Sequence, residues 1–129
     1  MSIEFDFSDL TRLAADLNAV DRRTAPFVRK AVEVSARNVK DNARALAASA
    51  FGSHGRRYPY MMQYEMKANR DQVWAEVGPR DTGQGKLAPI FENEGGVPGA
   101  TPTLKPALAA TQDDFVRGLQ QAIEDGLNA

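Results

Sequence analysis

The sequence predicts an α+β domain in which a long helix packs on a small antiparallel sheet and a second helix closes the chain. Apolar residues recur at spacings of three and four over residues 24–51 and again over 104–127. Over residues 60–78 they alternate with polar residues, as in a hairpin. Glycine and proline interrupt both patterns in the connecting loop and elbow, 79–103. A chain of 129 residues suits a single domain, 1–129, with one core.

Composition excludes several classes of function. Sixteen Lys and Arg residues stand against 17 Asp and Glu residues, so no net field favours nucleic acid or an anionic membrane. The absence of cysteine excludes disulfides, thiolate metal sites and cysteine nucleophiles, and fits maturation in a reducing cytoplasm. The acidic start MSIEFDFSDL is unlike a signal peptide, and no apolar run approaches the roughly 18 residues of a membrane span. We expect a soluble protein with no membrane partner.

The N-terminal arm, residues 1–20, admits two interpretations at its start. Three apolar residues alternate with acids there, namely Ile3, Phe5 and Phe7. This pattern is typical of a half-buried strand and equally of an apolar arm that docks on a neighbour, and both interpretations stay open. Ser8 can then cap a short helix that ends near Asn18. Its apolar positions would be Leu10, Leu13, Ala14 and Leu17.

The longest predicted helix spans 24–51, with Thr24 as N-cap, Pro26 in the first turn and no breaker before Gly52. Its apolar stripe consists of Val28, Val32, Ser35, Val39, Ala43, Leu46 and Ala50. The small residues of this stripe allow close packing, and we expect a short sheet as the partner. The basic residues off the stripe are Lys30, Arg37, Lys40 and Arg44. Because the whole chain is near neutral, we interpret them as a solvated face.

The hairpin over 60–78 begins with a row of four residues that should face the long helix: Tyr60, Met62, Tyr64 and Met66. Asn69-Arg70-Asp71 supplies the turn. The second strand alternates through Val73, Ala75 and Val77 and stops at Gly78-Pro79. The final helix takes Thr103 as its cap and buries Leu104, Leu108, Phe115, Leu119, Ile123 and Leu127.

Two connecting segments are expected to make contacts with other proteins. In the loop FGSHGRRYP, the lone His54 is more simply a surface residue than a ligand or base. Arg56 and Arg57 form a positive spot, so the loop could reach an acidic neighbour, and Tyr58 would add an aromatic anchor. The polar stretch 80–86 is a second recognition loop.

The elbow before the last helix should be stiff and sharply bent. Gly95 and Gly96 accept positive φ, whereas Pro98, Pro102 and Pro106 hold φ near one value. The glycines match neither a Walker pattern nor GxGxxG, so the elbow is expected to position its neighbouring elements rather than bind phosphate.

The sequence contains few candidate catalytic residues. Glu92 and Glu94 have no histidine near them in sequence, and with Asp81 they lack the spacing of an EF-hand. We therefore expect no enzymatic activity, no metal and no cofactor. Aromatic residues fall mostly at apparent core positions, so no platform for stacking nucleic-acid bases is evident.

From Val28 to Leu127 the chain resembles the tail-completion, or head-to-tail joining, proteins in the neck of long-tailed double-stranded DNA bacteriophages. An Ala-rich helix precedes RRYPYMMQYEM, where the family has His or Arg, then Tyr-Pro and an alternating strand. VWAEVGP is similar to the family's second hairpin strand. GKLAPIFENEGG followed by PTLKPAL resembles the family's apolar run, Glu, glycine, Pro-rich elbow and Pro-Ala-Leu helix start. The chain departs from that pattern at Asn93-Glu94, where the family more often has an aromatic residue.

The resemblance implies a structural virion protein, made in the host cytoplasm and placed at the head-tail junction. Its protomers would form a ring, a hexamer by analogy, between the head-completion protein and the tail terminator or tail tube, with DNA only passing through the lumen. The candidate assembly interface consists of Arg56, Arg57, Tyr58, Phe91, Glu92, Glu94, Gly95, Gly96, Pro98, Pro102, Leu104 and Pro106.

Other functions remain as alternatives. Within the same class, the chain could be the tail terminator that caps the tail tube. From another class, it could be a small nucleic-acid-binding regulator that uses Arg29, Arg37, Lys40, Arg44, Arg56 and Arg57. A small hydrolase or metal protein comes third.

Overall fold

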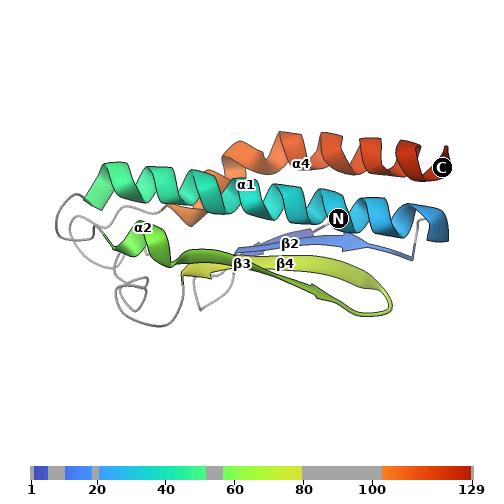
Figure 1. Cartoon of the computed structure of the whole chain (residues 1–129), viewed down its shortest axis with the longest axis horizontal. Helices are drawn as coiled ribbons and strands as arrows, with labels where there is room; N and C mark the ends of the chain where they lie inside the picture. Colours follow the sequence, from blue (N-terminus) through green and yellow to red (C-terminus); the bar gives the residue numbers. More distant parts are fainter. Residues whose placement is uncertain (1, 6–10, 19–20, 52–56, 80–102, 129) are drawn as a thin grey trace.

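Two long helices cover one face of a four-stranded antiparallel sheet, so the chain has the predicted α+β fold (Figure 1). The computed structural model describes residues 2–5, 11–18, 21–51, 57–79 and 103–128. The elbow lies outside these residues. None of the described helices is both long and apolar enough to cross a membrane.

The sheet has the strand order β1-β2-β4-β3, so the hairpin pairs with the N-terminal part of the chain. In register, Leu13 lies opposite Ala75, and Tyr64 lies opposite Val77. The strands are β1 (Ser2–Phe5), β2 (Thr11–Asp16), β3 (Met62–Ala68) and β4 (Gln72–Pro79).

The short helix that we expected after Ser8 is wrong, because residues Thr11–Asp16 form strand β2. Leu13 and Leu17 are four residues apart, a spacing that fits a helix and also fits one face of a strand. Ala15 between them is buried on the same side as Leu13, in the core under the helices. Pairing with β2 satisfies the backbone hydrogen bonds on the second edge of β4, which the hairpin alone leaves open. For β1, the strand interpretation is confirmed, since β1 pairs with β2.

The predicted hairpin is confirmed, with strands that begin at Met62 and end at Pro79. The Asn69 side chain makes the turn: its Oδ1 accepts hydrogen bonds from the backbone N–H of Asp71 at 2.8 Å and of Gln72 at 2.9 Å. Met62 is fully buried beneath the helices, and two further members of the predicted row, Tyr64 and Met66, pack against the core.

Helix α1 (Ala25–Phe51) confirms the long helix and follows a 3-10 turn, η1 (Arg22–Thr24). Asp21, rather than Thr24, supplies the side-chain cap of this turn: its Oδ1 accepts from the N–H of Arg23 at 2.9 Å. The Thr24 hydroxyl donates to the Asp21 carbonyl at 2.5 Å and is buried. The buried stripe then follows α1 as predicted as far as Ala43.

Toward its C-terminal end, the buried stripe of α1 passes through Ala47 and not through Leu46. Ala47 is fully buried, whereas 41% of Leu46 is exposed. Ala47, four residues after Ala43, lies on the same buried side of the helix, whereas Leu46, three residues after Ala43, lies beyond the edge of that side. The prediction for Leu46 is therefore wrong, and Ala50 lies outside the residues whose side chains are described.

Helix α4 (Leu104–Leu127) runs antiparallel to α1 on the same face of the sheet (Figure 1). Its buried face was only partly predicted, since Ile123 is half-buried and 49% of Leu127 is exposed. Small residues take their place on the buried side, namely Ala107, Thr111, Ala122 and Gly126. They let the two helices approach closely, so that a Cβ atom at Gly126 would lie 2.5 Å from the Cα of Thr24.

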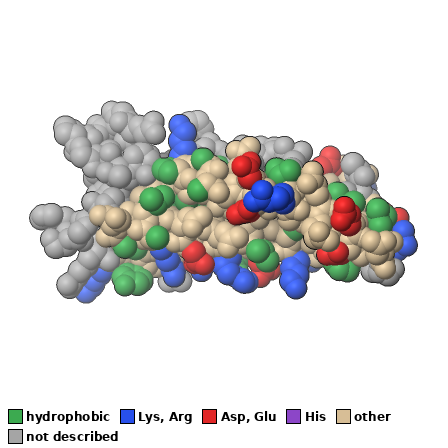
Figure 2. Space-filling model, turned by 90° about the horizontal axis from the view of Figure 1, so that it is seen from above, with side chains coloured by type: hydrophobic (Ala, Val, Ile, Leu, Met, Phe, Trp, Pro, Cys, Tyr) green, Lys and Arg blue, Asp and Glu red, His purple; other side chains and the backbone are tan. Residues whose placement is uncertain are grey.

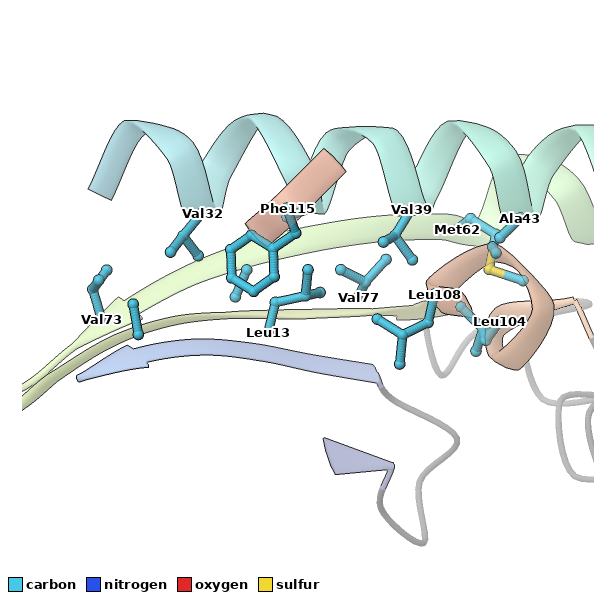
Figure 3. Close-up of a cluster of buried hydrophobic side chains, with 14 of the residues drawn as sticks. Leu13, Val32, Val39, Ala43, Met62, Val73, Val77, Leu104, Leu108 and Phe115 are labelled. Atoms are coloured by element: carbon cyan, nitrogen blue, oxygen red, sulfur yellow. The ribbon is translucent and has the colours of Figure 1, made fainter. Parts of the chain in front are cut away.

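One hydrophobic core lies between the sheet and both helices (Figure 3). Phe115 of α4 reaches into it beside Leu13 and is fully buried. Val32 and Val39 enter it from α1, and Val77 enters it from β4. The sheet therefore receives side chains from both helices at once, as expected for a two-layer α+β domain.

Two glycines of α4 should respond oppositely to alanine. Gly126→Ala is expected to lower the free energy of unfolding by about 1–3 kcal/mol, because the new methyl group meets the Thr24 backbone. Gly118→Ala, where a Cβ meets nothing within 4 Å, is expected to raise it by about 0.5–1 kcal/mol through helix propensity. Urea unfolding followed by circular dichroism measures both. Equal stabilities for the two variants would contradict the close contact at Gly126.

Candidate assembly surface

The described parts of the three family-like motifs meet at one end of the molecule. Met62, at the start of β3, pairs with Pro79, at the end of β4. Leu104 and Leu108 of the first turns of α4 lie beside Met62 and Ala43 in the core (Figure 3). Segments far apart in the sequence therefore share one packing unit at this end.

A short helix, α2 (Tyr58–Met61), forms the outer wall of this end. Its Tyr58 is fully buried, whereas 71% of Tyr60 is exposed. Both predictions for these tyrosines are therefore wrong, because we expected Tyr58 at the surface and Tyr60 in the buried row. Pro59 sits in the first turn of α2 and suits helical backbone there. In a helical turn Tyr58 and Met62 lie on one side, four residues apart, and Tyr60 turns outward.

Arg44 ties α1 to the start of strand β3. Its Nη2 donates a hydrogen bond to the Met62 carbonyl at 2.9 Å, and the side chain is half-buried. Lys40 is also half-buried, with its Nζ 5.6 Å from the centre of the Tyr64 ring and 3.4 Å from Asp41 Oδ1. The expectation that these two cations are fully solvated is therefore wrong, because their long side chains pack against the hairpin.

Arg37 forms an ion pair with Glu33 on the surface of α1. Its Nη2 lies 3.4 Å from Glu33 Oε1, and the Tyr64 hydroxyl lies 3.5 Å from the same oxygen. A hydrogen bond with Tyr64 and the charge of Glu33 raise the pKa of Arg37. The basic residues of α1 thus differ in their partners and do not form one continuous basic band.

Of the twelve residues predicted for the interface, four are described. Arg57 and Pro106 are exposed. Tyr58 and Leu104 are fully buried inside the chain, so each fills the core rather than a contact with a neighbour. The other eight lie outside the described residues, namely Arg56, Phe91, Glu92, Glu94, Gly95, Gly96, Pro98 and Pro102. His54 and Asp81 also lie outside them.

Tyr60 is a surface residue that the alternating sequence pattern does not predict. It is the most exposed large hydrophobic side chain among the described residues, and the exposed Arg57 precedes the same short helix. Tyrosine and arginine are the residue types that most often dominate the energy of protein contacts. The signal that could have found it is Pro59, whose preference for the first turn of a helix breaks the period-two pattern.

The outer face of the sheet carries polar contacts of a structural kind. Lys67 Nζ lies 2.6 Å from Glu76 Oε2, and this hydrogen bond raises the pKa of Lys67. The Arg12 guanidinium lies 4.7 Å from the centre of the Trp74 ring and donates to Gln72 Oε1 at 2.9 Å. Within the described ranges, no group of three or more His, Cys, Asp or Glu residues could hold a metal ion.

Comparison with known proteins identifies no relative. No family model matches the chain, and neither a curated protein nor a solved structure matches it significantly.

Alanine at the two tyrosines of α2 should separate core from surface. Tyr58→Ala is expected to lower the free energy of unfolding by about 3–5 kcal/mol, because it empties a fully buried site. Tyr60→Ala should change it by less than about 0.5 kcal/mol, as is usual for an exposed side chain. Urea unfolding measures both variants. A strongly destabilised Tyr60→Ala variant would show that this side chain belongs to the fold.

Proposed function

We propose that the chain is a structural protein of the phage neck, which joins the DNA-filled head to the tail as part of a ring. The observation that carries the proposal is the order of three motifs in one chain: RRYPYMMQYEM, VWAEVGP, and GKLAPIFENEGG with PTLKPAL. Each motif is loose by itself, and their order and spacing make the resemblance specific. The proposal assigns no enzymatic activity, metal or cofactor to the chain.

The arrangement at the α2 end supports an assembly role. The described parts of all three motifs pack together there, beside the exposed Tyr60 and Arg57. Strand β4 ends, and helix α4 begins, at this end (Figure 1). A contact region drawn from several neighbouring segments is what a ring-forming protomer needs to hold a fixed angle to its neighbour.

The charge of the described surface fits a protein that lets DNA pass. Figure 2 shows acidic, basic and hydrophobic side chains interspersed over the helical face, without a field of one sign. Arg44 is occupied by the Met62 carbonyl and Arg37 by Glu33, so two of the cations expected of a nucleic-acid regulator have partners within the chain. Weak attraction to phosphate avoids retention of DNA in a channel.

The proposal is tested by truncating this gene in its phage and examining the particles by negative-stain electron microscopy. Filled heads beside complete, unattached tails are expected, because both assemblies form and fail to join. Supply of the intact gene in trans should restore joined particles. Tails of irregular length would point to a tail terminator instead, and normal virions without the gene product would contradict a role in the neck.

The same complementation assay tests whether the exposed Tyr60 of α2 takes part in the contact. Tyr60→Ala, supplied in trans, is expected to lower the yield of joined particles at least about tenfold, as for an aromatic residue at the centre of a protein contact. Leu127→Ala is the matched control, since Leu127 is 49% exposed at the opposite end of the molecule (Figure 1). Full rescue by Tyr60→Ala would exclude this tyrosine from the contact.

A further inference from the structure

A groove of about 510 Å³ runs along the outer surface between α1 and α4. Phe27 and Ala31 of α1 and Ala122 of α4 give it an apolar floor. Val34 stands on its α1 side with 43% of its surface exposed, although it is a large hydrophobic residue. The groove therefore combines an apolar floor with an apolar side chain that points to solvent.

Gly118 keeps the α4 side of this groove open. Glycine within a helix costs about 0.5–1 kcal/mol relative to alanine. At Gly126 the close approach of Thr24 accounts for that cost, but at Gly118 a Cβ atom would meet nothing within 4 Å. Packing within the described part of the chain thus gives no reason for a glycine at this position, and Gly118 lines the groove.

The two sides of the groove carry opposite charges. Lys30 is the charged residue that lines the groove from α1, and Asp114 and Asp125 are the charged residues that line it from α4. Lys30 on the α1 side is exposed and forms no ion pair within the described part of the chain. Both acids are exposed; Asp114 forms an ion pair with Arg117, and Asp125 Oδ1 accepts a hydrogen bond from Gln121 Nε2 at 2.9 Å.

Two contacts show which residues of the helices lie at the same level. Thr24 touches Gly126 at one end, and Asn42 Nδ2 donates to Thr111 Oγ1 at 3.2 Å further along. Since the helices are antiparallel, interpolation between these contacts puts Val34 level with Gly118. Lys30 is then level with Gln121 and Ala122, about one helical turn from Asp125.

From this geometry we propose that two copies of the chain pair through their α1–α4 faces around a twofold axis along the groove. Such an axis places α1 of each copy over α4 of the other, with residues of the same level facing one another. Val34 of each copy then fills the open space at Gly118 of the other. Lys30 of each copy comes within reach of Asp125 of the other. The twofold axis therefore forms the Val34–Gly118 contact and the Lys30–Asp125 pair twice each.

A second copy suits this face because the same surface carries both members of each complementary pair, Val34 with Gly118 and Lys30 with Asp125. Val34 and Gly118 lie at one level, and Lys30 lies about one helical turn from the level of Asp125, as an isologous contact requires. A twofold contact closes on itself as a pair and cannot generate a ring. It is therefore separate from the ring contacts proposed above, and does not depend on them.

The test is sedimentation velocity of the purified chain over a range of concentrations. The wild-type chain is expected to show a reversible monomer–dimer equilibrium. Val34→Glu should weaken the dimer at least about tenfold, because the twofold axis repeats the lost contact and the buried charge. Leu46→Glu is the matched control on the same helix, with 41% exposure against 43% at Val34, and should leave the dimer intact.

Charge reversal provides an independent readout. Lys30→Glu or Asp125→Lys alone should weaken the dimer about tenfold, and the double variant should recover most of the loss, because each new pair again has opposite charges. Circular dichroism checks that every variant is folded. A monomeric wild-type chain would overturn the proposal and leave the face to a different partner. A dimer or larger oligomer that survives both Val34→Glu and Lys30→Glu would overturn it as well.

Discussion

The close packing of α4 against α1 is the contact on which the rest of the structure depends. Gly126 lets the C-terminal end of α4 approach the backbone of Thr24, and Asn42 bonds to Thr111 further along. These contacts set the level of α4 along α1 and hold Phe115 over the sheet. They also decide which side chains border the outer groove. A few small residues thus determine both the core and the surface.

At the α2 end, one proline changes which of the neighbouring side chains are buried and which are exposed. Pro59 favours a helical turn where alternation of apolar residues suggests a strand. That turn sends Tyr58 inward and Tyr60 outward, and the strand begins only at Met62. The buried tyrosine then joins residues from α1, β3 and α4 in one cluster. The exposed tyrosine stays on the surface of the domain.

The charges of α1 illustrate why composition alone describes a surface poorly. In the sequence, helix α1 carries several cations that could suit nucleic acid. In the fold Arg44 holds the Met62 carbonyl, and Lys40 lies near the Tyr64 ring. Lys30 remains exposed beside the acidic side of α4. The near-neutral total charge therefore does not reveal which cations are held by partners within the chain and which stay exposed.

Local patterns in the sequence determined the α+β class, the two long helices and the hairpin turn at Asn69, because periodicity and side-chain capping act over a few residues. Tertiary structure alone decided that Leu13 lies in a strand, since its spacing to Leu17 fits either element and pairing with β4 selects one. It likewise decided that Ala47 is buried and Leu46 exposed, and that Gly126 is needed where Gly118 is not. Those outcomes depend on what the neighbouring element places opposite each residue, which no local pattern contains.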